Sequence, residues 1–462
     1  MTHSNVNPAP SARRLAYQAL YDVLEKGAYA NITLQAIWAA YHLKKEESHL
    51  LTELVYGVLR KYNHLLWIIS CLSKQPLKKL HPSVRILLCL GLYQLLFLSR
   101  IPESAAVNES VKIARKVTHP GNVRFINGLL RNYLRQKESL VIPTAEENQG
   151  LHDELTYNLP AWLLQRWEKE WGRERMEKVC AAMNETPALT VRANALKTTR
   201  DALREAMAAQ EIESEEIPGL AEGLIIRKGA GQFFAHFLSD GSAYVQSASS
   251  MVPAKVLAPQ PGQQILDMCA APGSKTTQMA EMMRNEGSID AWDLYPHKIS
   301  LLKRNAKKEG ITIIHAGARD SAKPMPQVNE KYDGVLLDAP CSGLGVLGHK
   351  AEIRWRRNEK DLEAFPPLQR ALLTCAAAYV KPGGTLVYST CTLNGGENED
   401  MVDWFLQHFP DFRAEPFSLP GVKDAADGQM TLWPDEWGSD GFFVAKLRKQ
   451  GWERPRDTLY PE

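Results

Sequence analysis

The sequence lacks several features that mark common protein classes. Its seven cysteines form no CxxC pair and no Cys/His spacing typical of zinc, and an odd number spread over 462 residues does not suggest a disulfide framework. The longest apolar run, Ser83 to Leu98, contains Arg85 and Gln94 and falls short of the roughly 20 residues that span a bilayer. The N-terminal stretch MTHSNVNPAPSARR has no apolar segment of a secretion signal. We therefore expect reduced thiols, no metal, no membrane span and a cytoplasmic location.

Acidic residues are scarce in the first third of the chain. The whole sequence has a net charge of +2, but residues 1–140 contain 19 Lys and Arg against 8 Asp and Glu, a net charge of +11. The remainder contains 36 basic and 45 acidic residues, a net charge of −9. Such an uneven distribution favours contact between the first third and a nucleic acid. A solvated basic surface without a partner is the alternative.

Three regions differ in their apolar pattern. Residues 1–140 repeat apolar positions at intervals of three and four, which predicts an all-helical bundle. Residues 150–235, after a polar and proline-broken linker, predict a small α+β segment. From 236 to 450, short apolar runs alternate with helical stretches. This alternation favours an α/β, Rossmann-like domain with a mostly parallel, doubly wound sheet.

The stretch ILDMCAAPGSKT joins a predicted strand to a predicted helix through small residues. Small residues let the backbone approach a ligand closely, and the helix start presents free N–H groups. The next predicted strand ends in Asp293, whose carboxylate can accept hydrogen bonds from ribose hydroxyls. We expect the turn from Cys269 to Lys275 to bind a nucleoside-containing cofactor. The alternative is a structural turn, with Asp293 capping a helix.

Two more predicted strands bring thiols to the same edge of the sheet. LLDAPCSG ends its strand at Asp338 and places Cys341 just beyond, and LVYSTC delivers Cys391. Two thiols at adjacent strand ends are more than packing requires, whereas Cys269 is expected to pack within the turn. Four others lie in helical patterns and are expected to be buried, as cysteine usually is: Cys71, Cys89, Cys180 and Cys375.

A thiolate beside a nucleoside cofactor suggests covalent catalysis. Carbon 5 of cytosine is a poor nucleophile, but addition of a thiolate to carbon 6 produces an enamine that can attack a methyl donor. This chemistry requires a thiol, an acid that hydrogen-bonds the pyrimidine ring and a base for the carbon-5 proton. The target cytosine must also be flipped or unpaired, because stacking hides its face.

The motifs LDMCAAPGSKT, LLDAPCSGLG, YVKPGGTLVYSTCTL, ENE and DGFFVAKL together resemble the RNA cytosine-5 methyltransferases of the NOL1/NOP2/Sun type. The basic helical region, with PESAAVNESVKIA and FINGLLRNYLR, is similar to the NusB-like domain of one bacterial branch. The resemblance covers nearly the whole chain. It implies an S-adenosylmethionine-dependent enzyme that makes 5-methylcytidine in small-subunit ribosomal RNA, and we expect a monomer.

The resemblance also implies a role for each matching residue. Cys391, in the TC motif, would be the nucleophile, and Cys341, in the PC motif, would assist breakdown of the covalent adduct. Asp338 would hydrogen-bond the target cytosine, and Lys275 would lie close to the substrate. The cofactor would be held by the turn and two strand-end carboxylates: Cys269, Ala270, Ala271, Pro272, Gly273, Ser274, Lys275, Asp293 and Asp338.

Two departures from the family pattern bear on the cofactor. Ser274 stands where the family usually has a second glycine, a mild change if its backbone angles are ordinary. Where a D-x-R motif is expected to contact adenine, the chain reads HAGARDS, with Gly317 or Ala318 at the acidic position before Arg319. Asp320 is a candidate replacement from a shifted register.

The segment after the PC motif interleaves cations with an aromatic residue. This pattern suits contacts with phosphates and a stacked base, and a solvated basic loop is the alternative. The residues concerned are His349, Lys350, Arg354, Trp355, Arg356 and Arg357.

Two rival functions share most of these features. One is a non-enzymatic RNA-binding or antitermination factor with an inactive methyltransferase domain, which the intact Cys391, Cys341 and Asp338 disfavour. The other is the same chemistry on transfer RNA or DNA. DNA cytosine methylases place the nucleophile in the PC motif, so the test is which cysteine is indispensable.

Overall fold

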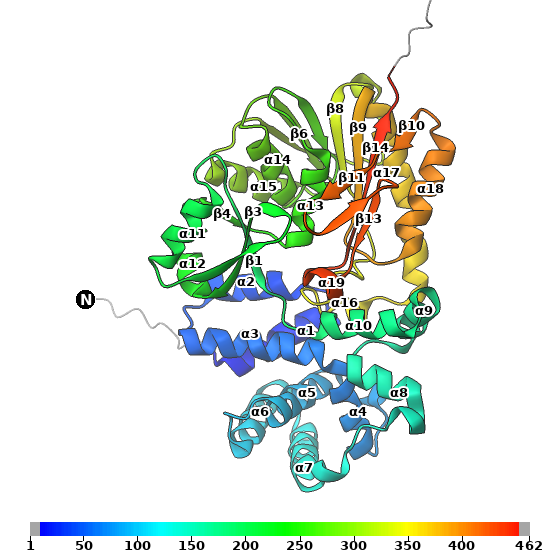
Figure 1. Ribbon diagram of the computed structural model, residues 1–462. Helices are drawn as coiled ribbons and strands as arrows, with labels where there is room; N and C mark the ends of the chain where they lie inside the picture. The colour runs from blue at the N-terminus through cyan, green and yellow to red at the C-terminus, as the bar shows by residue number, and fades with distance from the viewer. Residues whose placement is uncertain (1–9, 452–462) are drawn as a thin grey trace, which may run out of the picture. The chain divides into compact units, whose positions relative to one another are not determined.

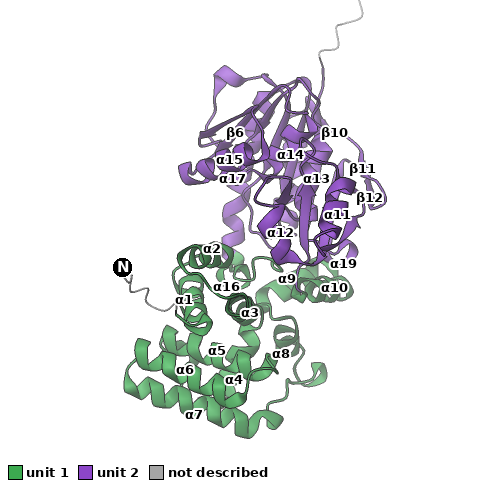
Figure 2. Ribbon diagram, turned by 90° about the vertical axis from the view of Figure 1, so that its left-hand side faces the viewer, with its two compact units in different colours: residues 1–185, 347–359 green, residues 186–346, 360–462 purple. Residues whose placement is uncertain are grey.

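The computed structural model describes residues 10–451. Most of the N-terminal stretch MTHSNVNPAPSARR, which showed no secretion signal, therefore lies outside the described residues. The chain divides into two compact units, residues 1–185 with 347–359 and residues 186–346 with 360–462 (Figure 2). We call them the helical unit and the methyltransferase-like unit. Within residues 10–451, no helix is both long and apolar enough to cross a membrane.

The helical unit is an α-bundle built on amphipathic helices. α1 buries Leu15, Ala19 and Val23 on one face, as the spacing predicted. α5 is buried almost continuously from Ser83 to Gln94, so the longest apolar run forms the central helix of the bundle. Its helices are α1 (Ala12–Glu25), α2 (Ala30–Ala40), α3 (Lys45–Arg60), α4 (Tyr62–Leu72), α5 (Pro82–Phe97), α6 (Glu103–Val117), α7 (Pro120–Gln136), α8 (Ala145–Tyr157), α9 (Ala161–Trp171), α10 (Arg173–Asn184) and α16 (Ile353–Arg356), with 3-10 turns η1 (Leu77–Lys79) and η2 (Lys137–Ser139).

The segment 347–359 belongs to the helical unit, although it follows the PC motif in sequence. Arg354 is 1% exposed and donates to the carbonyls of Asn158 and Met183. Burial lowers its pKa to about 9. Trp355 donates to the carbonyl of Leu59, and Arg356 donates to backbone carbonyls of the same unit.

The prediction that this segment offers its cations and aromatic ring to RNA is therefore wrong for Arg354, Trp355 and Arg356. Arg354 Nη2, Trp355 Nε1 and Arg356 Nη2 each donate to a backbone carbonyl inside the helical unit. A cation next to a tryptophan has the same sequence pattern whether it faces a phosphate or a neighbouring helix end, and only the fold distinguishes the two.

A small antiparallel sheet lies at the start of the methyltransferase-like unit. Its strand order is β2-β3-β1-β4, and α11 and α12 contribute Leu203, Met207 and Phe233 to its core. The predicted α+β segment, 150–235, thus includes the later part of α8, then α9 and α10 of the helical unit, and part of this sheet. The elements are β1 (Leu189–Ala193), β2 (Glu213–Ile217), β3 (Leu220–Lys228), β4 (Ala243–Val245), α11 (Arg200–Ala208) and α12 (Ala230–His236).

The larger sheet has the order β10-β14-β9-β8-β5-β6-β7, with β13 paired to β14 (Figure 1). β5 to β9 pair in parallel, and β10, β13 and β14 are antiparallel. The strands are β5 (Gln264–Asp267), β6 (Ser288–Asp293), β7 (Ile314–Ala318), β8 (Tyr332–Asp338), β9 (Val380–Thr390), β10 (Phe412–Ala414), β13 (Gln429–Leu432) and β14 (Phe442–Lys449).

Helices cover both faces of this sheet, so the predicted mostly parallel, doubly wound architecture is confirmed. One buried cluster joins α13, α14 and α15 to the strands, and another joins α17 and α18 to the opposite strand positions. The remaining elements are α13 (Ala248–Leu257), α14 (Ser274–Met282), α15 (Pro296–Glu309), α17 (Phe365–Tyr379), α18 (Glu399–His408), α19 (Pro434–Trp437), η3 (Pro326–Val328), η4 (Glu359–Ala364), η5 (Gly395–Glu397), β11 (Phe417–Leu419) and β12 (Lys423–Ala425).

Candidate active site

Neighbouring parallel strands end in polar residues at one edge of the sheet. In the order β9, β8, β5, β6, the last residues are Thr390, Asp338, Asp267 and Asp293. The carboxyl ends of parallel strands are where open α/β sheets bind ligands. The edge therefore gathers three carboxylates, and Cys391 follows directly after β9.

The thiols of Cys341 and Cys391 lie side by side at this edge. Their sulfur atoms are 3.3 Å apart, and both residues are partly exposed. Gly345, in the loop after Cys341, donates its N–H to the carbonyl of Cys391 at 3.0 Å. A Cβ at position 345 would collide with the carbonyl oxygen of Gly441. The close approach of these backbones explains a glycine there and brings the two thiol loops together.

The Cys341 thiol is held in its protonated form. The hydrogen bond with Cys391 is the main cause that raises its pKa, followed by burial and by the carboxylates of Glu397 and Asp338. A protonated Cys341 can donate its S–H to the sulfur of Cys391. Donation to a thiolate favours that charged form, so the pair is arranged for one thiolate and one thiol.

Glu397, in the ENE motif, is buried between the two thiol loops. It accepts hydrogen bonds from Ser342 N at 2.9 Å, Ser342 Oγ at 2.5 Å, Asn394 Nδ2 at 2.9 Å and Gln369 Nε2 at 3.0 Å. These four donors satisfy a carboxylate that burial alone would disfavour. One side chain thus ties the loop after β8 to the turn after β9. The sequence pointed to the motif but not to this contact.

Lys275 and Asp338 form a second pair at the edge. Lys275 Nζ lies 2.7 Å from Asp338 Oδ2 and 2.8 Å from Ser250 Oγ, and Lys275 is only 9% exposed. Ser389 Oγ donates to the other oxygen of Asp338 at 2.8 Å. Lys275 is therefore a buried, paired lysine and not one of the solvated lysines common at helix starts. Sequence reasoning missed Ser250 and Ser389, because a serine carries no signal of its partner.

The small-residue turn runs from β5 into α14 at the same edge. Gly273 has a φ of +108°, and a Cβ there would lie 2.9 Å from Leu302 Cγ, so both conformation and space require glycine. Ser274 opens α14 without a positive φ, so the departure from a second glycine is mild. Cys269 packs in the core cluster, and burial raises its pKa.

Asp293 does not cap α15, whose N-cap residue is Tyr295, and the ribose contact stays a prediction. Its Oδ1 accepts the N–H of Tyr295 just before α15, so it caps the local turn. Within the described residues, its Oδ2 has no protein partner and remains available to a ribose hydroxyl. Together with the free N–H groups at the start of α14, this carboxylate fits a nucleoside-containing cofactor.

The departure HAGARDS lies at the end of β7. A Cβ at Gly317, one of the two candidate positions for the family's acid, would meet no atom within 4 Å, so a larger residue would fit there. Asp320 accepts the N–H of Ala322 at 3.2 Å and pairs with Lys323 at 3.4 Å. Its carboxylate is engaged in its own turn, and its contact with adenine stays a prediction.

Arg192, on β1, anchors the helix that carries Lys275. It is fully buried and donates to Ser274 O at 2.8 Å, Glu281 Oε1 at 2.7 Å and Glu309 Oε2 at 3.2 Å. Burial raises the pKa of Glu309 to about 7. The small sheet is therefore fixed to α14 and α15 by a buried ionic cluster. The only sequence signal was a charged residue in the middle of an apolar strand.

The remaining cysteines test the expectation of packing. Cys89, Cys180 and Cys375 are buried, as predicted. The prediction is wrong for Cys71, which is exposed in the last turn of α4. An apolar pattern predicts a helix but does not show which of its turns is left uncovered by neighbouring helices.

Three family models match the chain. Residues 254–448 match the 16S rRNA methyltransferase RsmB/F family, residues 10–135 the NusB family, and residues 159–231 a ferredoxin-like domain of RsmF/B-like methyltransferases. The second match agrees with the resemblance stated for the basic helical region.

Curated proteins match over nearly their whole length. A probable ribosomal RNA small subunit methyltransferase B of Synechocystis is 38% identical, over 95% of this chain and 99% of that protein. Its counterpart in Bacillus subtilis is 36% identical, over 96% and 99%. The crystal structure of NSun6 from Pyrococcus horikoshii with SFG superposes with a TM-score of 0.56 and 25% identity, covering 63% of this chain and 98% of that one.

Proposed function

The chain belongs to the 16S rRNA methyltransferase RsmB/F family, and on this premise we propose that it forms 5-methylcytidine in small-subunit ribosomal RNA through a covalent bond between Cys391 and the target cytosine. It is an S-adenosylmethionine-dependent RNA methyltransferase. One observation carries the proposal: two thiols 3.3 Å apart lie at the strand ends that also hold Asp338 and the small-residue turn from Cys269 to Lys275.

The cofactor would be held by the turn from Cys269 to Lys275 and by Asp293. The free N–H groups at the start of α14 and the unpartnered Oδ2 of Asp293 support this assignment. Asp338, three residues before Cys341 on the chain, would serve both the cofactor's reacting end and the cytosine. When bound, S-adenosylmethionine supplies an electrophilic methyl group.

Cys391 begins the reaction as a thiolate and bonds to carbon 6 of the cytosine. The S–H of Cys341 stabilises that thiolate before attack. Asp338 hydrogen-bonds the pyrimidine ring, and Lys275 holds Asp338 in position through its 2.7 Å contact. Electron density then reaches carbon 5, which takes the methyl group.

Cys341 completes the reaction. Its raised pKa depends first on the hydrogen bond with Cys391, so covalent capture of Cys391 lowers the Cys341 pKa and lets its proton leave to solvent. The resulting thiolate takes the proton from carbon 5. The bond between carbon 6 and Cys391 then breaks, its electron pair returns to that sulfur, and the product is released.

The three sequence regions would divide the work. Residues 1–140 and 150–235 would hold RNA, and residues 236–450 would perform the chemistry. The net charge of +11 in residues 1–140 supports the first part. The monomeric state and the cytoplasmic location remain predictions, as does Asp320 as the adenine contact.

The choice of substrate is tested by nucleoside analysis. Purified protein is incubated with S-adenosylmethionine and either small-subunit ribosomal RNA or transfer RNA, and digested products are separated by mass spectrometry. We expect 5-methylcytidine in the ribosomal RNA with wild type and none with Cys391→Ser. Preferential modification of transfer RNA would contradict the ribosomal assignment, and no product with either RNA would favour a non-enzymatic RNA-binding factor.

A further inference from the structure

A pocket lies in the helical unit, formed by the starts of α5 and α7, the end of α6 and the turn η1. Its volume is about 740 Å³, within the range of small-ligand sites, roughly 300–1,000 Å³. We call it the α5–α7 pocket, and none of its lining residues is acidic. They are Gln75, Lys79, Leu80, His81, Val84, Lys116, Val117, Thr118, His119, Asn122 and Phe125.

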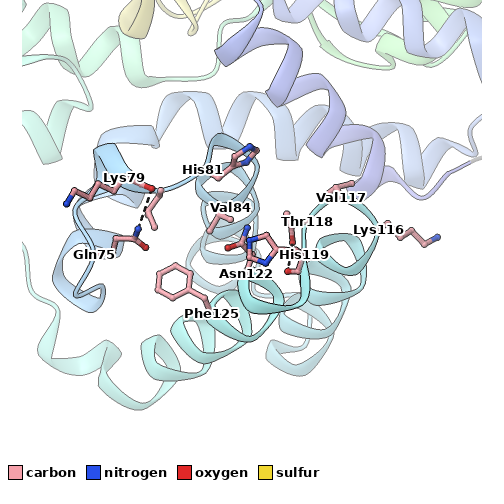
Figure 3. A pocket seen from close by; sticks show the side chains of 11 residues that line it. Gln75, Lys79, His81, Val84, Lys116, Val117, Thr118, His119, Asn122 and Phe125 are labelled. Carbon is pink, nitrogen blue, oxygen red and sulfur yellow. Dashed lines mark hydrogen bonds between the residues drawn. The ribbon is translucent and has the colours of Figure 1, made fainter.

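The positive charge of this pocket comes from two helix N-termini and from two lysine side chains. α5 and α7 both begin there, with His81 and His119 as their N-cap residues, and each helix start carries a partial positive charge. Lys79 and Lys116 lie on opposite sides of the pocket (Figure 3). Neither lysine forms an ion pair with any carboxylate in residues 10–451. The pocket is therefore positive and not neutralised by the protein.

The pocket floor adds groups that suit a base. Phe125 is half-buried and lines the pocket between the two lysines (Figure 3), so part of its ring is open to a ligand. Asn122 and His119 stand beside it and can exchange hydrogen bonds with a base edge. His81 accepts the N–H of Ser83 at Nδ1, which leaves its Nε2 to donate outward.

We propose that the α5–α7 pocket binds one unpaired RNA nucleotide, with its base against Phe125 and its flanking phosphates on Lys79 and Lys116. A cationic groove with an exposed aromatic ring is the arrangement by which proteins hold single strands. A duplex fits poorly, because its base faces are stacked and unavailable to the ring. The inference rests on the proposed function only in taking RNA as the substrate.

The lysines are tested first, by anisotropy titration of the full-length protein with a short unpaired RNA over a range of salt concentrations. The double variant Lys79→Gln, Lys116→Gln is expected to bind about tenfold more weakly and to lose about one to two units of the log–log salt slope. The matched control, Lys26→Gln with Lys137→Gln, removes the same charge from exposed lysines already paired with Asp22 and Glu103. An equal loss in the control would overturn the proposal.

The ring is tested with Phe125→Leu, which keeps an apolar side chain for the core and removes the stacking surface. We expect weaker binding of the unpaired RNA and unchanged binding of the matched duplex. Equal losses for both RNAs, or no loss for either, would overturn the base contact. A variant that loses affinity for an acidic peptide but not for unpaired RNA would show a protein partner instead and would also overturn it.

Methyl transfer separates this proposal from the proposed function. At saturating RNA the pocket variants should keep the wild-type kcat and show a raised KM for RNA, because they leave Cys391, Cys341 and Asp338 intact. If wild type binds RNA but transfers no methyl group, the proposed function fails while the binding comparison still decides the pocket. If wild type is active and the variants bind like it, the pocket proposal fails alone.

Discussion

Two groups of charged side chains, one in each unit, are used in opposite ways. In the methyltransferase-like unit, one group is paired within the protein: Arg192 with Glu281 and Glu309, and Lys275 with Asp338. In the helical unit, the lysines of the α5–α7 pocket are exposed and have no ion-pair partner among the described residues. Buried pairs fix geometry at a cost in desolvation, whereas open cations attract a polyanion and respond to salt. The buried pairs hold their side chains in position, whereas the exposed lysines attract a negatively charged ligand.

The largest expected effect comes from breaking the buried cluster. Arg192→Leu would leave Glu281 and Glu309 buried without their cation, which we expect to reduce the free energy of unfolding by about 3–5 kcal/mol. Urea titration followed by tryptophan fluorescence measures the change. Arg204→Leu, which removes a half-exposed arginine from the surface pair with Glu216, should have little effect. Similar losses for both variants would remove the contrast between the two kinds of charge.

A buried carboxylate should make stability depend on pH. Burial raises the pKa of Asp267 to about 7, against about 3.9 in an unfolded chain. Between these values the native state binds the extra proton, so this group lowers the free energy of unfolding as pH rises from about 4 to about 7, by up to about 4 kcal/mol. Its penalty is absent below the unfolded pKa and complete above the folded one.

Asp267→Asn tests that assignment. The variant should flatten the decline in stability between about pH 4 and pH 7, the span up to the raised Asp267 pKa of about 7, as measured by urea titration at several pH values in that span. Asp403→Asn, on the exposed face of α18, is the control. An unchanged pH profile in Asp267→Asn would contradict a raised pKa.

A smaller effect is expected from the carboxylate that joins the thiol loops. Glu397→Gln keeps the size of the side chain but turns one acceptor into a donor facing Ser342 or Gln369. We expect kcat to fall by about 10- to 100-fold because the thiols lose their alignment, with little change in KM for S-adenosylmethionine. Loss of its negative charge should also lower the pKa of Cys341.

Two readouts separate that positioning role from a general loss of structure. The pH dependence of iodoacetamide labelling at Cys341 should move to lower pH in Glu397→Gln, and the free energy of unfolding should stay near that of the Asp403→Asn control. A variant with normal kcat, or with a wild-type labelling profile, would show that Glu397 does not govern the thiol pair.

The smallest effect is expected from replacing Cys71, the exposed thiol of the helical unit. Cys71 should react with a thiol reagent in the native protein well before the buried Cys89, and Cys71→Ser should remove this labelling without changing methyl transfer. Peptide mapping after brief labelling identifies the site. Fast labelling of Cys89 instead would contradict the packing of α5.

The sequence predicted the parts of the site that depend on local order along the chain. The turn from Cys269 to Lys275 and the strand ends at Asp293 and Asp338 follow from an apolar run that meets small or acidic residues, and the fold places them where expected. Neighbouring strands then bring Cys341 and Cys391 together.

Contacts between residues that are distant in the sequence could not be predicted from local patterns. Arg192 contacts Glu281, which lies 89 positions further along the chain. No local sequence pattern predicts this pair. The prediction that Trp355 faces RNA was wrong for the same reason. The carbonyl of Leu59 that it contacts lies 296 positions away in the sequence. Charge and aromaticity identify a side chain that needs a partner, and only the tertiary fold shows which partner it has.

The most direct test of the central claim is a denaturing gel of protein incubated with labelled RNA and S-adenosylmethionine. We predict that Cys341→Ala accumulates a covalent protein–RNA band, because Cys391 still attacks while release is blocked. Cys391→Ala and the double variant should show no such band and no methyl transfer. A covalent band in Cys391→Ala that is absent from Cys341→Ala would reverse the two roles and contradict the account.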